Sequence, residues 1–160
     1  MPNPNSVKIT WYDVDNFCRK LAKRIKSSGY EPEIIMGIQR GGCITAVFVS
    51  HLLNTQDFYT LSVRTTVSED ANATRKVPMI RDDPYLRFVV AKKRVLIVDD
   101  VTDTGATLRA AKEYVLKFKS KQVKTAAAVW DTTTSKKICE ADYYGGKIDA
   151  WVDFPWENRI

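Results

Sequence analysis

The stretch from Asp99 to Thr107 brings two kinds of polar group together. Asp99 and Asp100 offer carboxylate oxygens, which can accept hydrogen bonds from sugar hydroxyls or bind Mg²⁺ through water. From Thr104 to Thr107 the chain offers backbone amides and two hydroxyls at an expected helix N-terminus, a favourable place for a phosphate group. Acceptors for a diol beside donors for an anion predict a site for a ribose 5-phosphate.

Two other interpretations of this stretch are weaker. A Walker A loop needs Gly-Lys-Ser/Thr, whereas Gly105 is followed by Ala106 and Thr107. A plain helix start accounts for two acids followed by a threonine and a glycine. It does not account for the whole run of strand, two acids, Thr-Gly and a second threonine, so we favour ligand binding.

Short apolar runs alternate with helical patterns in the rest of the chain. Helices are expected between Thr10 as N-cap and Gly29 as stop, and over residues 44–53 and 108–118. Strands are expected at residues 33–38, 58–63, 94–98 and 123–130, with short ones near Tyr143 and Trp151. This order predicts an α/β fold with a mainly parallel sheet flanked by helices. Without a visible linker or repeat, residues 1–160 are expected to form a single domain.

Composition excludes several functional classes. Three widely spaced cysteines and one histidine, His51, argue against a zinc site and against a Cys/His or Ser/His mechanism. No membrane-spanning run or export signal is visible, so a cytoplasmic protein with no membrane partner is expected. The net charge of +6 suits an anionic ligand, although a basic solvated surface has the same charge.

Three segments together resemble the type I phosphoribosyltransferases. Residues 95–107 resemble the phosphoribosyl pyrophosphate (PRPP) signature of that family, and residues 37–42 resemble its pyrophosphate loop. Residues 151–157 are similar to the C-terminal segment of its xanthine–guanine and archaeal purine members. The resemblance spans roughly residues 33–157 and implies the type I fold, with a mobile flap over about residues 65–92 and a small C-terminal base-binding hood.

The resemblance implies which residues bind each part of PRPP. Asp99 and Asp100 are assigned to the ribose and to a Mg²⁺ cofactor, which they would bind directly or through water. The 5-phosphate is assigned to Asp103, Thr104, Gly105, Ala106 and Thr107. Pyrophosphate is assigned to Arg40, Gly41, Arg75 and Lys76. The alternatives are that Arg40 is an exposed surface charge and that the two flap cations are solvated.

Asp103 and the C-terminal segment are implied to act on the base. Asp103 would handle a proton at purine N7 as a catalytic acid/base; its alternative is a helix cap. Trp151 would stack on the purine, while the backbone of Val152 or the carboxylate of Asp153 would meet the base edge. Trp151 as a core residue is the alternative, and residues 154–156 are assigned to packing.

One expected residue is missing from the base site. An aspartate at position 103 is the choice of enzymes that use 6-oxopurines, and those relatives place a lysine near the end of the strand at residues 123–130. Here Val129 or Trp130 stands in its place, with Lys136 and Lys137 several residues downstream.

The implied reaction transfers the 5-phosphoribosyl group from PRPP to hypoxanthine, guanine or xanthine in purine salvage. The products are a nucleoside monophosphate and pyrophosphate, and a homodimer or homotetramer is implied. Transfer to another nitrogen base is one alternative. A PRPP-sensing regulator that binds RNA or DNA is another, but a nucleic-acid partner is not expected, since no such motif is visible and Arg40 and Asp103 are both present.

Overall fold

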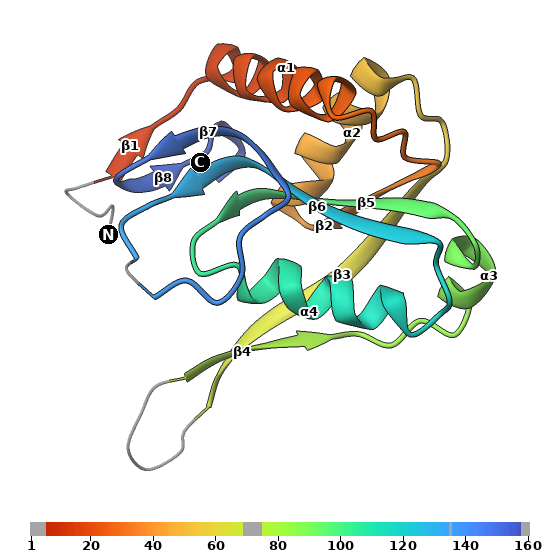
Figure 1. Ribbon diagram of the computed structural model, residues 1–160. Helices are drawn as coiled ribbons and strands as arrows, with labels where there is room; N and C mark the ends of the chain where they lie inside the picture. Colours follow the sequence, from red (N-terminus) through yellow and green to blue (C-terminus); the bar gives the residue numbers. More distant parts are fainter. Residues whose placement is uncertain (1–5, 69–74, 135, 158–160) are drawn as a thin grey trace.

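The computed structural model describes residues 6–68, 75–134 and 136–157, and within them a central sheet lies between two helical layers (Figure 1). The strands are β1 (Ser6–Lys8), β2 (Ile34–Gln39), β3 (Phe58–Ser68), β4 (Arg75–Ile80), β5 (Arg94–Thr102), β6 (Gln122–Asp131), β7 (Tyr143–Ile148) and β8 (Trp151–Asp153). The helices are α1 (Trp11–Ser27), α2 (Gly41–Leu53), α3 (Leu86–Val90), α4 (Ala106–Leu116) and the short 3-10 helix η1 (Pro155–Glu157).

The six strands of the main sheet follow the order β4-β3-β2-β5-β6-β7. All neighbours pair in parallel except β3 and β4, which form an antiparallel hairpin. Helices α1 and α2 cover one face, and α4 covers the other (Figure 1). The predicted α/β fold with a mainly parallel sheet is therefore confirmed.

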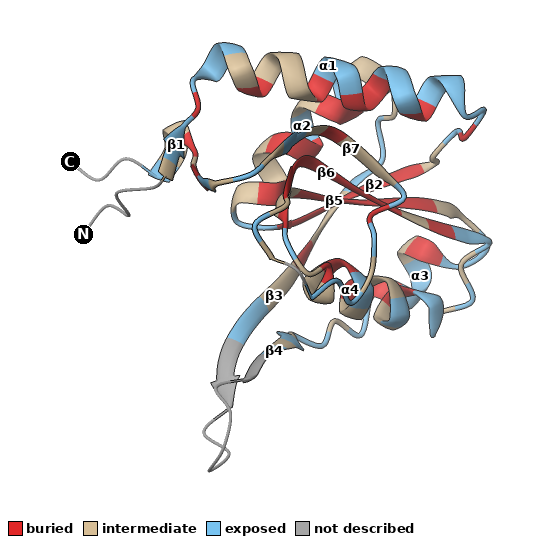
Figure 2. Cartoon of the chain, turned by 60° about the vertical axis from the view of Figure 1, so that its left-hand side comes forward, coloured by how far each residue is buried: buried red, intermediate tan, exposed pale blue. Residues whose placement is uncertain are grey.

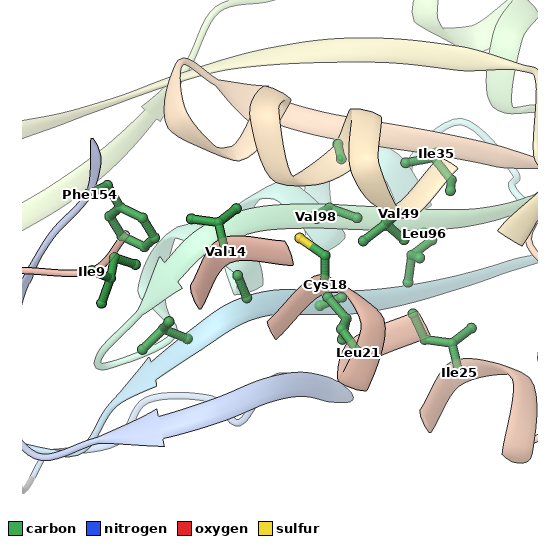
Figure 3. Close-up of a cluster of buried hydrophobic side chains, with 14 of the residues drawn as sticks. Ile9, Val14, Cys18, Leu21, Ile25, Ile35, Val49, Leu96, Val98 and Phe154 are labelled. Atoms are coloured by element: carbon green, nitrogen blue, oxygen red, sulfur yellow. The ribbon is translucent and has the colours of Figure 1, made fainter. Parts of the chain in front are cut away.

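Apolar side chains fill both interfaces between helices and sheet, which is why buried residues follow the central strands in Figure 2. On the first face, α1 contributes Val14, Cys18, Leu21 and Ile25, at the helical spacing that the sequence shows. They share one apolar cluster with Ile35 of β2 and with Leu96 and Val98 of β5 (Figure 3). Helix α1 itself lies closest to β7, β6 and α2, and α2 lies on β2 and β5, the strands whose carboxyl ends carry the polar motifs.

The helix boundaries follow from local chemistry. Thr10 caps α1 in a capping box with Asp13, each side chain bonded to the other residue's backbone N–H. Beyond the helix, Gly29 adopts a left-handed φ of 74°. The predicted cap and stop of this helix are both confirmed.

The structure differs from the sequence-based expectation in three places. Strand β5 does not end at Val98 but continues to Thr102, because it keeps pairing with β6 up to Trp130. The segment from Arg64 to Lys93, which showed no sustained pattern, contains the end of β3, all of β4 and the short helix α3. Strand β1 was not anticipated.

Strands β1 and β8 form a separate parallel pair, called here the terminal sheet. Val7 pairs with Val152, and the N–H of Ile9 donates to the carbonyl of Asp153 over 3.1 Å. In Figure 1 this pair lies at the same end of the molecule as the carboxyl ends of β5 and β6.

Among the described helices, none is long and apolar enough to cross a membrane.

Asp142 joins α4, β6 and the start of β7. Its carboxylate accepts hydrogen bonds from the N–H and the hydroxyl of Thr125 at 2.8 and 3.1 Å. Lys124 and Lys112 lie 3.0 and 3.3 Å from it. Burial raises the pKa of Asp142, but the Thr125 N–H and the two ammonium groups outweigh burial and hold this pKa below its ordinary value.

Asp142→Asn is expected to lower the free energy of unfolding at pH 7 by about 1–3 kcal/mol, because a charged acceptor is lost. A folded-state pKa below the unfolded value gives stabilisation that is fully present above about pH 4 and is lost as the pH falls further. Urea unfolding at pH 7 and pH 3 checks this. The difference from wild type should shrink at pH 3, while the control Asp15→Asn, in an exposed pair with Arg19, should change little. An equal loss at both pH values would contradict the assignment.

Candidate active site

Asp99, which is buried, and Asp100, which is half-buried, form an acid pair near the end of β5. Asp99 is only 9% exposed, and its carboxylate accepts the N–H of Asp100 at 2.9 Å. The carboxylate of Asp100 accepts the N–H of Val101 at the same distance. Burial, then the charge of its neighbour, raises the pKa of Asp99, and burial also raises that of Asp100. A cation beside the pair would favour the ionised form of both groups.

Two glycines let the start of α2 approach the acid pair. A Cβ at Gly42 would lie 2.8 Å from both a carboxylate oxygen of Asp99 and the carbonyl oxygen of Val98. A Cβ at Gly41 would overlap the carboxylate of Asp100. Because only glycine avoids these clashes, the Gly-Gly pair explains how the loop and the acids share one small volume.

The N-terminus of α2 is a candidate anion site. Arg40 is its N-cap residue and is exposed, and it follows a cis peptide bond to Gln39. Among the described residues, no side chain caps this helix and no acid lies in its first turn. Its first amides, the positive end of its dipole and the Arg40 guanidinium can therefore all serve an anion.

The N-terminus of α4 is a second such site. Gly105 is its N-cap with a left-handed φ of 77°, so the N-cap residue itself has no side chain to cap the helix, and the first turn holds no acid. Just before it, the exposed carboxylate of Asp103 accepts the N–H of Thr104. The hydroxyl of Thr104 accepts the N–H of Ala106 at 3.3 Å. The polar groups of residues 103–107 are thus gathered in one turn, with helix amides left over for a ligand.

The connection between β6 and β7 supports this turn from outside. The N–H groups of Ile138 and Cys139 donate to the carbonyl of Thr104 at 2.8 and 3.1 Å. A Cβ at Gly105 would overlap the carbonyl group of Cys139. The shape of the turn therefore depends on a segment more than thirty residues further along the chain.

The predicted base-binding residues lie in β8 with different environments. Trp151 is 53% exposed, so its ring is available for stacking, whereas Val152 is buried. The carboxylate of Asp153 accepts a hydrogen bond from the hydroxyl of Ser6 in β1. This contact gives the Asp153 side chain a structural partner, and its backbone carbonyl is also bonded, to Ile9.

Val129 and Trp130, the two residues at one of which a lysine was expected, are both buried, Trp130 at 4% exposure. The Trp130 side chain has several contacts. Its ring contacts Tyr144 edge-on, with centroids 5.2 Å apart. The ammonium groups of Lys137 and Lys147 lie 4.1 and 4.6 Å from its centroid. Lys137 therefore folds back from the downstream loop onto this strand end, as its position allowed.

The flap cations lie at the margin of the described chain. Strands β3 and β4 form a hairpin in which Arg75 pairs with Ser68 and Lys76 with Val67. The side chains of Arg75 and Lys76, and residues 69–74, fall outside the described part of the structure. Their assignment to pyrophosphate, and the mobility of the flap, stay predictions.

The acid pair suits a magnesium ion that is shared with a ligand. No group of three or more His, Cys, Asp or Glu side chains gathers anywhere in the described residues, so they form no complete protein cage. Mg²⁺ commonly takes one or two carboxylates and completes its shell with water and substrate oxygens. Asp99 and Asp100, near two helix ends that are candidate anion sites, could supply the one or two carboxylates of such a magnesium ion.

A cleft of about 620 Å³ lies on the opposite edge of the sheet, at the amino ends of β2, β3 and β5. Its lining mixes lysines with glutamates, and Glu33 is already paired with Lys93 and Arg94. The chemistry that converges on a ligand is therefore at the carboxyl edge, where ligands of open α/β sheets bind.

Fold and site together define an α/β protein that can hold a ligand with two phosphate groups around a pair of acids. Residues 11–159 match the phosphoribosyl transferase domain family, so the chain belongs to that family. The expected family and its fold are thereby confirmed.

Individual relatives agree with the family match. The purine phosphoribosyltransferase of Pyrococcus horikoshii is 33% identical, with a TM-score of 0.78 over 97% of this chain and 96% of that one. The hypoxanthine-guanine phosphoribosyltransferase of Aquifex aeolicus is 28% identical over 85% of this chain and 76% of its own length. The xanthine-guanine phosphoribosyltransferase of Cereibacter sphaeroides is 23% identical over 100% and 92%.

Proposed function

We propose that the protein transfers the 5-phosphoribosyl group of PRPP to a purine base, hypoxanthine, guanine or xanthine, and releases pyrophosphate. One observation carries the proposal: two helix N-termini whose N-cap residues make no side-chain cap, those of α2 and α4, flank the acid pair of Asp99 and Asp100. PRPP has the matching shape, since it carries a phosphate at one end, a pyrophosphate at the other and a diol between them. The names of the relatives support a purine acceptor.

In this proposal each end of PRPP is bound by one helix start. Thr104, Gly105, Ala106 and Thr107 hold the 5-phosphate, with Asp103 at the entrance to that turn. Arg40 and the amide of Gly41 hold the pyrophosphate, helped by the flap cations Arg75 and Lys76. Asp99 and Asp100 accept hydrogen bonds from the ribose hydroxyls and share in binding Mg²⁺. When bound, the metal ion supplies positive charge beside the leaving pyrophosphate.

The chemical step exchanges one bond at ribose C1 for another. The C1–oxygen bond to pyrophosphate breaks, and a bond from C1 to a ring nitrogen of the base forms. Asp103 accepts the proton from purine N7 as the bond to C1 forms, so that the base reacts as a nucleophile. Trp151 stacks on the base, and Val152 and Asp153 lie along its edge. Closure of the flap excludes water from the cation-like centre.

A different nitrogen base is the second candidate function. The strand end that would present a lysine to the oxygen at C6 instead presents Trp130, which is buried against Tyr144. The ammonium groups of Lys137 and Lys147 contact the Trp130 ring.

By likeness to the family, the proposal includes a homodimer or homotetramer in the cytoplasm, with no nucleic-acid or membrane partner.

The test is an assay of purified protein with PRPP, Mg²⁺ and a panel of bases, following nucleotide and pyrophosphate together. We expect product from at least one of hypoxanthine, guanine and xanthine, and none from the control Asp99→Asn/Asp100→Asn. Product from adenine or a pyrimidine alone would contradict the 6-oxopurine assignment. No product from any base, with PRPP still bound, would favour a PRPP-sensing regulator.

A further inference from the structure

The segment that follows β8 returns to the acid pair. It ends in η1, whose central residue is Trp156. The indole nitrogen of Trp156 lies beside the Asp100 carboxylate: it is 3.1 Å from the place where a Cβ of Gly41 would be, and a carboxylate oxygen of Asp100 overlaps that same place. Because the only polar group of indole is an N–H donor, this proximity lowers the pKa of the Asp100 carboxyl, against the larger effect of burial. Three segments far apart in sequence therefore meet at this one carboxylate.

The orientation of the Trp156 ring is fixed by its packing. It stacks on Phe154, with centroids 4.5 Å apart and planes 15° apart, and Phe154 is itself buried. On another side it meets Trp11, at the start of α1, with centroids 5.6 Å apart. Glu157 closes the turn: its carboxylate accepts the N–H of Phe154 at 2.9 Å, and its own N–H donates to the Phe154 carbonyl at 3.0 Å. The indole N–H is thus held beside Asp100 by a rigid support.

Each oxygen of Asp100 has a donor close to it. One accepts the N–H of Val101, while the other lies next to the Cα of Gly41, as the indole nitrogen of Trp156 does. Donors on two sides leave the remaining lone pairs of the carboxylate with a defined direction.

We infer that Trp156 is a positioning residue of the PRPP site: its indole N–H holds Asp100 in the orientation that binds the ribose and Mg²⁺. This inference rests on the proposed function. It also joins the two substrates, because Trp156 is only five residues beyond Trp151, in the segment assigned to the base. When that segment packs against the rest of the protein, it therefore also places Asp100 for binding PRPP.

The matched variants are Trp156→Phe and Trp11→Phe. The first keeps an aromatic ring on Phe154 but removes the donor to Asp100; the second alters the same aromatic cluster without touching the acid. Loss of a hydrogen bond to a charged group is expected to weaken Mg²⁺–PRPP binding about tenfold in Trp156→Phe, measured by calorimetry. In Trp11→Phe the affinity should stay within about twofold of wild type.

A second readout does not depend on activity. The chain has four tryptophans, so ¹⁵N-tryptophan labelling gives four indole signals, and the one missing from Trp156→Phe belongs to Trp156. Asp100→Asn is expected to shift that signal and to leave the signal of Trp130 in place. If Trp156→Phe does not fold, the Trp156 signal can be assigned in the wild-type protein from the contacts of its indole N–H with neighbouring protons.

Unchanged PRPP affinity in Trp156→Phe, or an unmoved Trp156 signal in Asp100→Asn, would overturn the inference. These results differ from a failure of the proposed function. A wild-type protein that binds PRPP, shows both expected effects and yet turns over no base would retain the positioning role and lose the transferase assignment.

Discussion

Asp103→Asn is expected to lower kcat by about 10²–10⁴-fold while PRPP affinity changes little, because general acid/base catalysis contributes on that scale. The exposed carboxylate of Asp103 accepts the N–H of Thr104, and the amide oxygen of asparagine can accept the same hydrogen bond. The substitution therefore preserves the turn and removes the proton-transfer group. Steady-state kcat, with PRPP binding measured separately by calorimetry, checks the split.

Asp103→Ala separates this role from simple capping. If Asp103 only shapes the turn, the asparagine variant should work normally and the alanine variant should lose PRPP affinity. If it acts on the base, both variants should lose kcat to a similar extent. Normal turnover in Asp103→Asn would remove this residue from the chemistry.

Gly105→Ala is expected to weaken PRPP binding by more than tenfold and to destabilise the fold. A left-handed conformation costs a residue with a Cβ about 1 kcal/mol. At Gly105, where φ is 77°, the Cβ would also overlap the carbonyl of Cys139, so the turn must shift as a whole. The shift would displace the amides that are proposed to hold the 5-phosphate. Urea unfolding and PRPP titration measure the two effects.

Gly29→Ala is the matched control for this change. Gly29 has nearly the same φ, 74°, but a Cβ there would meet no atom within 4 Å. The Gly29→Ala substitution therefore has the same conformational cost, at the carboxyl end of α1 and away from the site. If Gly105→Ala behaved like Gly29→Ala in both stability and PRPP affinity, the close contact with the Cys139 segment would have no functional weight.

Local patterns were sufficient to predict most of the fold. Helix α1 combines a cap, a regular apolar stripe and a glycine stop, and strand β5 carries four consecutive apolar residues, Val95 to Val98, so both could be found in the sequence. Strand β1 could not, because three residues form a strand only through pairing with β8. Strand β4 was missed for a related reason: its partner is the polar end of β3, where no alternation of apolar residues marks it.

The site was predictable wherever one short motif carries it. Asp99, Asp100 and the turn at Gly105 belong to one continuous stretch, and Arg40 stands beside two glycines. The contacts between distant segments carried no such signal. Trp156 was assigned to packing, yet its indole nitrogen also lies beside Asp100, and Lys137 covers Trp130 from a loop without periodicity. Such contacts depend on where the folded chain returns, which one sequence does not encode locally.

The terminal sheet has a consequence for the order in which the two substrate sites are built. Ser6 and Asp153, bonded to each other, are 147 positions apart, so this pair closes almost the whole described chain into a loop. It contributes only three residue pairs, whereas β5 is paired on both sides in the centre of the main sheet. A small element with a large closure entropy is the natural part to open first and to form last. The acceptor segment can thus open and re-form while the main sheet and the starts of α2 and α4 stay folded, and Asp100 loses its neighbour Trp156 each time the segment opens. Faster amide exchange at Val152 than at Leu96 is the expected result.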